Sequence, residues 1–106
     1  MKLPKGFGNM GNLLQQAQAA MEQAKQLQDD LKLETVEAEN SGVKVKFNGA
    51  GEVLSVSIPP ELMNKEDVES LEDALLLALR DGYNRSIELR ESRMKQIAGG
   101  LNLPGL

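Results

Sequence analysis

The sequence predicts an α+β fold with a long N-terminal helix, a three-stranded antiparallel β-meander and a long C-terminal helix. Three observations predict this order. Apolar residues recur at helical spacing from residue 10, alternate with polar residues between 34 and 58, and return to helical spacing after residue 64. A chain of 106 residues has the length of one domain, so we expect a single domain over 1–106.

The first helix is predicted over residues 10–32. Its apolar residues form a heptad seam with alternating steps of three and four: Met10, Leu13, Ala17, Ala20, Ala24, Leu27 and Leu31. The outer face is rich in glutamine, an uncharged residue that favours helices. Residues 1–9 precede the helix, contain two lysines and lack periodicity, so we expect them to form a flexible basic arm.

The middle stretch, 34–58, is predicted to form three strands, each with one apolar and one polar face. Tight turns at 40–42 and 48–51 join consecutive strands, and Pro59-Pro60 ends the third. The polar face of the first hairpin brings two glutamates opposite two lysines, which favours one register. These residues are Glu37, Glu39, Lys44 and Lys46.

The second helix is predicted over 64–98, with Asn64 as its N-cap and Gly99-Gly100 as its stop, followed by a tail over 99–106. Apolar residues between 68 and 79 cover more than half of the helix circumference, which predicts that this stretch is buried. Gly82 costs about 1 kcal/mol relative to alanine inside a helix, and we expect it to mark a bend.

The length of this second helix predicts self-association. A helix over 66–97 would be about 48 Å long, whereas a compact domain of about 100 residues has a radius of gyration near 13 Å. The distal half must project from the body or pack on another subunit. We therefore expect a homodimer with protruding helical arms.

The composition argues against an enzyme. The chain has no Cys and no His, which excludes thiol nucleophiles, His-based triads and zinc sites with these ligands. Three carboxylates near the start of the second helix, Glu69, Glu72 and Asp73, are better explained by the helix dipole than by acid–base catalysis. We expect no catalytic, metal or cofactor site. No apolar run reaches the ~18 residues of a membrane span, so we expect a soluble intracellular protein without a membrane partner.

The net charge of −4 is unevenly distributed. Residues 29–76 contain twelve acidic and four basic residues, whereas residues 1–28 and 77–106 each have two more basic than acidic residues. Arg85, Arg90 and Arg93 fall within about 140° around the second helix and form a basic stripe. The alternative is that intrahelical pairing neutralises this stripe. The acidic partners would be Asp81, Glu88 and Glu91.

Taken in order, these features make the whole chain resemble the YbaB/EbfC family of nucleoid-associated proteins. The resemblance rests on the order and spacing of short segments along nearly the full length. These segments are 6–10, 13–18, 43–49, 51–54, 58–62, 71–75 and 99–106. One departure is Arg80-Asp81-Gly82, where family members usually carry Asn-Asp-Ala followed by basic residues.

The resemblance implies a tweezer-like homodimer whose arms bind DNA without catalysis, in the bacterial cytoplasm and nucleoid. Plastid relatives exist, so a plastid location stays open. We expect contacts mainly to backbone phosphates, weak sequence preference, and an effect on gene expression or nucleoid organisation. The residues expected to bind DNA are the basic residues of the arms and N-terminus: Lys2, Lys5, Lys25, Arg85, Arg90, Arg93 and Lys95.

A function of another class stays open at this point. The protein could be an adaptor or chaperone-like dimer that holds an unidentified partner protein without binding DNA. It would use the Gln-rich helix and the apolar positions of the arms. The net charge of −4 favours this alternative, because DNA phosphates repel acidic surfaces.

Overall fold

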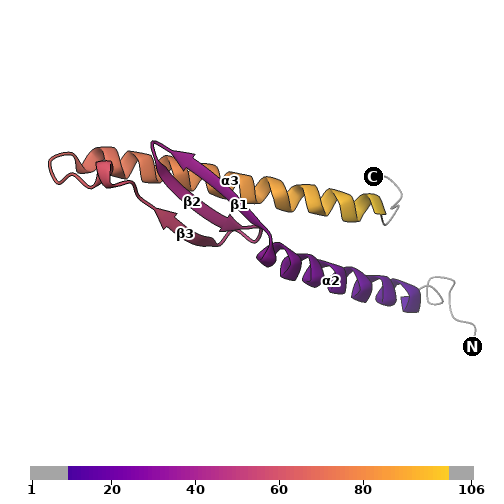
Figure 1. Cartoon of the computed structure of the whole chain (residues 1–106). Helices are drawn as coiled ribbons and strands as arrows, with labels where there is room; N and C mark the ends of the chain where they lie inside the picture. Colours follow the sequence, from indigo (N-terminus) through magenta and orange to yellow (C-terminus); the bar gives the residue numbers. More distant parts are fainter. Residues whose placement is uncertain (1–9, 101–106) are drawn as a thin grey trace, which may run out of the picture.

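The computed structural model describes residues 10–100, so the predicted basic arm and most of the predicted tail lie outside the described residues. The predicted α+β fold is confirmed, with the strands antiparallel in the order β1-β2-β3. The elements are α2 (Met10–Leu33), β1 (Thr35–Asn40), β2 (Val43–Asn48), β3 (Val53–Ser57), the short 3-10 helix η1 (Pro60–Leu62) and α3 (Val68–Gly100) (Figure 1).

The chain is elongated because both long helices extend beyond the sheet. Its radius of gyration is 21.7 Å and its extents are 82 × 21 × 20 Å. Helix α2 and the distal half of α3 extend from the sheet toward the same end of the molecule (Figure 1). The length of the second helix predicted that its distal half projects from the body or packs on another subunit, and in the single chain it projects beyond the sheet.

The strand register agrees with the charge pattern of the first hairpin. Glu37 pairs with Lys46 and Glu39 pairs with Lys44, and the Lys46 Nζ lies 3.6 Å from the Glu37 Oε1. The β2–β3 register shifts between Lys46 and Phe47, so that the pairing passes over Leu54. Such a bulge keeps apolar side chains on one face despite the extra residue.

A row of small residues packs α3 against the sheet. Its members are spaced four apart on one face of α3 and are all buried: Ala74, Ala78, Gly82 and Ser86. A Cβ on Gly82 would lie 2.6 Å from the Phe47 Cδ1 and 2.9 Å from the Val45 Cγ2. Gly82 is therefore a point of close approach between helix and sheet. Helix α3 continues through Gly82 without interruption, and the structure gives this residue a role in packing.

The predicted ends of the second helix need correction. Helix α3 begins at Val68, four residues later than predicted. Asp67 caps it, since its Oδ1 accepts a hydrogen bond from the Ser70 N–H at 3.3 Å, whereas Asn64 accepts one from the Glu66 N–H in the preceding turn. The helix also includes Gly99 and Gly100, because glycine weakens a helix by about 1 kcal/mol without forbidding it.

The predicted burial of the first part of α3 is confirmed only in part for a single chain, since Ala74 and Ala78 are buried but other apolar residues are not. Leu76 and Leu77 are 48% and 44% exposed. One sheet can cover only one side of a helix, and the row of small residues occupies that side. The opposite side of α3 has no second layer within the described residues.

The end of α2 is anchored by the β2–β3 turn. Leu31 is only 1% exposed. The Gly49 N–H donates to the Leu31 carbonyl at 2.8 Å and to the Glu34 carbonyl at 3.0 Å, which satisfies carbonyls that a helix end leaves free. The buried Asn48 side chain stabilises this turn by accepting from the Ala50 and Glu52 N–H groups. The rest of α2 is exposed, apart from a half-buried Leu27.

The close approach at Gly82 predicts that Gly82→Ala is destabilising. Overpacking against Phe47 should outweigh the gain in helix propensity and lower the free energy of unfolding by about 1–3 kcal/mol. The matched control is Gly11→Ala, since a Cβ at Gly11 meets no atom within 4 Å. The control should be neutral or slightly stabilising in chemical denaturation. Equal stabilisation by both substitutions would contradict the packing described above.

Candidate nucleic-acid interface

Five of the seven predicted DNA-binding residues lie in the part of the chain that the structure describes. Lys25 belongs to α2, and Arg85, Arg90, Arg93 and Lys95 belong to α3. The other two, Lys2 and Lys5, fall outside residues 10–100. The five differ in what surrounds them, and this decides which are available to a ligand.

Arg85 links α3 to the edge of the sheet. Its Nη1 donates a hydrogen bond of 2.7 Å to the Glu37 carbonyl of β1. The side chain is otherwise exposed and has further N–H donors. Arg85 therefore contributes to the packing of α3 on β1 and retains donors that a ligand could use.

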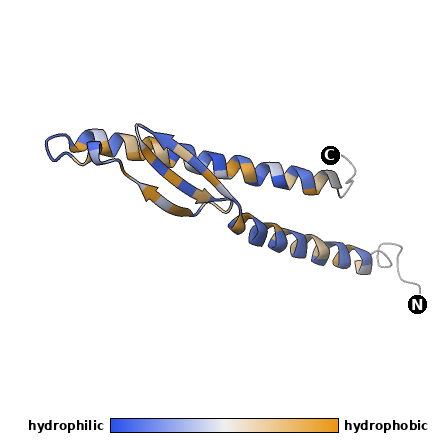
Figure 2. Ribbon diagram, viewed as in Figure 1, coloured by the Kyte–Doolittle hydropathy of each residue, from blue (hydrophilic) through white to orange (hydrophobic). Residues whose placement is uncertain are grey.

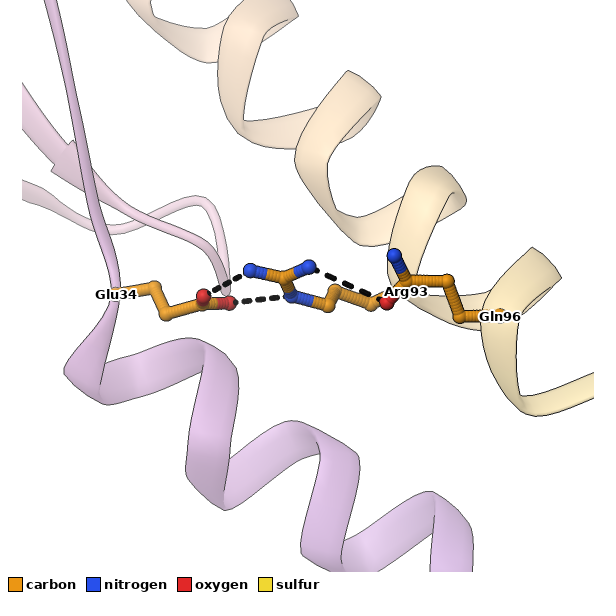
Figure 3. Close-up of polar contacts among 3 residues, drawn as sticks. All are labelled: Glu34, Arg93 and Gln96. Atoms are coloured by element: carbon orange, nitrogen blue, oxygen red, sulfur yellow. Dashed lines mark hydrogen bonds and ion pairs between the residues drawn. The ribbon is translucent and has the colours of Figure 1, made fainter. Parts of the chain in front are cut away.

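Arg93 is held by residues of its own chain (Figure 3). Its Nε donates to the Glu34 Oε2 at 3.0 Å, its Nη2 donates to the Glu34 Oε1, and its Nη1 donates to the Gln96 Oε1 at 3.2 Å. All three guanidinium nitrogens thus have acceptors. The two charged side chains are only 37% and 34% exposed.

The ion pair also shifts the titration of both groups. Hydrogen bonding from Arg93 lowers the pKa of Glu34 below its ordinary value of 4.5 and, in turn, the carboxylate raises the pKa of Arg93. Because the pKa of Glu34 is lower in the folded than in the unfolded chain, the ion pair stabilises the fold fully above pH 4.5. This stabilisation is lost as the pH falls through the folded-state pKa. At neutral pH the pair is fully charged.

The remaining three cationic side chains are exposed and have no hydrogen-bonding partner among residues 10–100. Lys25, Arg90 and Lys95 form no hydrogen bond or ion pair with any residue in the range 10–100. The intrahelical neutralisation considered from the sequence is not observed there. Across this range there are two ion pairs: Glu37–Lys46 joins β1 to β2, and Glu34–Arg93 joins the residue between α2 and β1 to α3.

A cleft of about 580 Å³ lies between α2 and the distal part of α3. The Glu34–Arg93 pair lies in its wall, together with Leu27, Asp30 and Ile97. Three glutamines contribute amide groups to the same wall: Gln23, Gln26 and Gln96. The cleft contains two carboxylates, and the donors of its one arginine are already hydrogen-bonded within the chain, so it is a poor site for phosphate. The three exposed cationic side chains are not part of its lining, so they face other surfaces of the arms.

An apolar surface of the sheet is left exposed by residues 10–100. Helix α3 packs on β1 and β2, and every residue of β3 is exposed. We call the apolar residues of this region the β3 patch: Val53 (51% exposed), Leu54 (50%), Val56 (45%) and Ile58 (37%). Hydrophobic positions along β3 are visible in Figure 2. An uncovered apolar edge strand is a favourable surface for association.

Sequence reasoning missed two features of this region. Glu34 lies 59 residues from Arg93 in the chain, and no local pattern connects them. The β3 patch has the same apolar alternation as the covered strand β2, so the sequence could not show that it is uncovered.

Two further properties of residues 10–100 bear on function. No helix in this range combines the length and apolarity that crossing a bilayer requires. The same residues contain no group of three or more Asp, Glu, His or Cys side chains arranged to hold a metal ion.

Comparison with known proteins agrees with the resemblance found in the sequence. Residues 6–101 match the YbaB/EbfC DNA-binding family. A nucleoid-associated protein of Thermoanaerobacter pseudethanolicus is 43% identical over 105 residues, which cover 97% of this chain and 94% of the relative. A nucleoid-associated protein of Syntrophobacter fumaroxidans is 41% identical over 108 residues, covering 100% and 94%.

The fold is shared with a solved structure. The crystal structure of an uncharacterized protein from Helicobacter pylori has a TM-score of 0.72 and 30% sequence identity, and the match covers 87% of this chain and 96% of that one. The family match, the relatives and the shared fold all extend over most of the chain. The chain therefore belongs to the YbaB/EbfC DNA-binding family.

Proposed function

We propose that this protein is a homodimeric nucleoid-associated protein that binds DNA mainly through backbone phosphates and with weak sequence preference. The observation that carries the proposal is the match of residues 6–101 to a DNA-binding family. Relatives at about 40% identity are named nucleoid-associated proteins, which supports action in a bacterial nucleoid. The function requires no catalytic step, and its consequence would be altered nucleoid organisation or gene expression.

Arg90, Lys95 and Lys25 are the principal phosphate-binding residues in this proposal. They are exposed on the helical arms and have no acceptor among residues 10–100. The body of the chain is acidic and would repel DNA, which directs phosphates to the arms. Arg85 joins the set through its remaining donors, and Lys2 and Lys5 join from the N-terminal segment. Contacts between flexible cationic side chains and phosphates position the protein on the duplex but do not distinguish one base from another. The preference for particular DNA sequences is therefore weak.

The second copy of the chain in this proposal covers the β3 patch. Burying apolar surface contributes roughly 25 cal/mol per Å², and four apolar residues at one sheet edge give a self-complementary interface its core. Tyr83 lies beside the β2–β3 turn and is 47% exposed, which extends the apolar surface toward α3. A dimer also doubles the number of cationic arms, so a modest charge per chain suffices for binding.

An adaptor function is the second candidate, favoured by the apolar wall between the arms. Leu27, Met94 and Ile97 line a small apolar space there, next to the glutamines of α2. A partner protein held in this space would remain bound after nuclease treatment of a lysate. Loss of all partners after nuclease, together with binding of purified DNA, favours the DNA-binding function.

The double variant Arg90→Gln, Lys95→Gln is expected to weaken DNA binding. It removes four charges per dimer, so the slope of log K against log salt concentration should fall by about 3 to 4. Fluorescence anisotropy with a labelled duplex at several salt concentrations measures this slope. The matched control is Arg80→Gln, Lys44→Gln, which changes the net charge equally but alters the body. An equal loss of DNA affinity in both variants would show that the arms are not the binding surface. If the wild type does not bind DNA at low salt, the proposed DNA-binding function is wrong.

The proposed dimer predicts that only one of two neighbouring substitutions on β3 disrupts it. Val56→Glu places a charge in the β3 patch and should convert the dimer to a monomer at micromolar concentration, as measured by light scattering after size exclusion. Ser55→Glu is the control, because Ser55 pairs with Lys46 on the polar face of the sheet. A Val56→Glu protein that stays dimeric would show that the second copy binds elsewhere.

A further inference from the structure

The orientation of α2 depends on very few contacts. From Met10 to Asp30 its residues are exposed, apart from the half-buried Leu27, and the buried anchor is Leu31 at the last turn. The free part of the helix is about 30 Å long, so a rotation of 10° at its base moves the tip by about 5 Å. Small changes at this joint are therefore amplified into large changes in the separation of the arms.

Two kinds of contact act at the joint. The Gly49 N–H bonds to the Leu31 and Glu34 carbonyls hold the end of α2 on the sheet. They attach the helix at one point and leave its angle free. The Glu34–Arg93 pair adds a second attachment, because Glu34 directly follows α2 while Arg93 belongs to the distal half of α3. The two attachments lie close together, at the last turn of α2 and at the residue that follows it, but they reach different elements, the β2–β3 turn and α3. Together they restrict the angle of the helix more than either does alone.

The geometry of this pair suits a brace. A guanidinium and a carboxylate that share two parallel hydrogen bonds must be nearly coplanar, which restricts the rotation of both side chains. Gln96 accepts from the third nitrogen and fixes the guanidinium further (Figure 3). Both charged side chains are about one-third exposed, so water screens them less than it would screen a fully solvated pair.

The same geometry argues against a phosphate contact by Arg93. A phosphate would have to displace Glu34 from two hydrogen bonds and approach Asp30 in the same wall. Both carboxylates would repel it. Arg93 belongs to the basic stripe by its position on the helix, but its charge is already neutralised.

We propose that Glu34 and Arg93 form a brace that sets the angle between α2 and α3, and that Arg93 serves DNA binding as a positioning residue. The part concerning DNA rests on the function proposed above, whereas the part concerning the angle does not. The brace is a property of one chain and is measurable without any ligand.

Distances between spin labels on the two arms test the brace directly. The natural chain has no Cys, so Gln16→Cys and Ser92→Cys introduce two unique sites on exposed arm positions. Labelled protein is mixed with excess unlabelled protein, so that each measured pair lies within one chain. Glu34→Arg should shift or broaden the distance distribution, and the charge swap Glu34→Arg, Arg93→Glu should restore it. The control is the swap Glu37→Lys, Lys46→Glu on the sheet, which should leave the distances unchanged.

DNA affinity of the same variants separates positioning from direct contact. Glu34→Arg raises the net charge of each chain by two, so electrostatic attraction alone would tighten DNA binding. Loss of the brace should instead weaken DNA binding by about fivefold or more. The charge swap should regain the affinity and salt slope of the wild type. Circular dichroism melts verify that each variant is folded.

The outcomes are distinct. Unchanged distances in Glu34→Arg would overturn the brace. Restored distances with a lasting loss of affinity in the charge swap would overturn the positioning role and identify Arg93 as a phosphate contact. If the wild type binds no DNA at low salt, the proposed function fails, and the distances alone decide the brace.

Discussion

The close approach of α3 to the sheet is the constraint on which the rest of the structure depends. A row of small residues, centred on Ala78 and Gly82, lets the helix backbone lie directly against Phe47 and Val45. Because the row follows one face of a long helix, it fixes the direction of α3 across the sheet and hence the direction of its free distal half. The same one-sided packing leaves β3 without a covering layer among the residues that the structure describes. The projecting arm and the uncovered apolar edge thus have one common cause.

The order of elements could be predicted from the sequence because it depends on local periodicity. The heptad seam of α2 and the alternation of the strands are visible within ten residues, and the register of the first hairpin follows from opposite charges. Burial was less predictable. Leu76 belongs to an almost continuous apolar run, yet it is exposed, since its burial depends on whether a second layer exists. The role of Gly82 also escaped prediction, because it depends on the ring of Phe47, which approaches from another element.

The candidate site shows a related limit. Helical geometry alone predicted a stripe of Arg85, Arg90 and Arg93, and the three residues do lie on one helix. Their surroundings differ because two of them meet acceptors from distant segments: the Glu37 carbonyl and the Glu34 carboxylate. Residue type and spacing cannot distinguish a cation that stabilises the fold from one that is free for a ligand. That distinction appears only when β1 and the end of α2 are placed beside α3.

The anchoring of α2 at a single turn has a consequence for the energetics of the chain. Leu31 and Gly49 connect this helix to the sheet, so α2 can lose its helical structure while the core of β1, β2 and α3 stays intact. We therefore expect α2 to open more readily than the core of β1, β2 and α3. Amide protons of the exposed helix should exchange with solvent through fraying of that helix, and those of the core only through global opening. A partner that binds along α2 would therefore stabilise the helix against fraying, and part of its binding free energy would offset the conformational entropy of the residues that it orders.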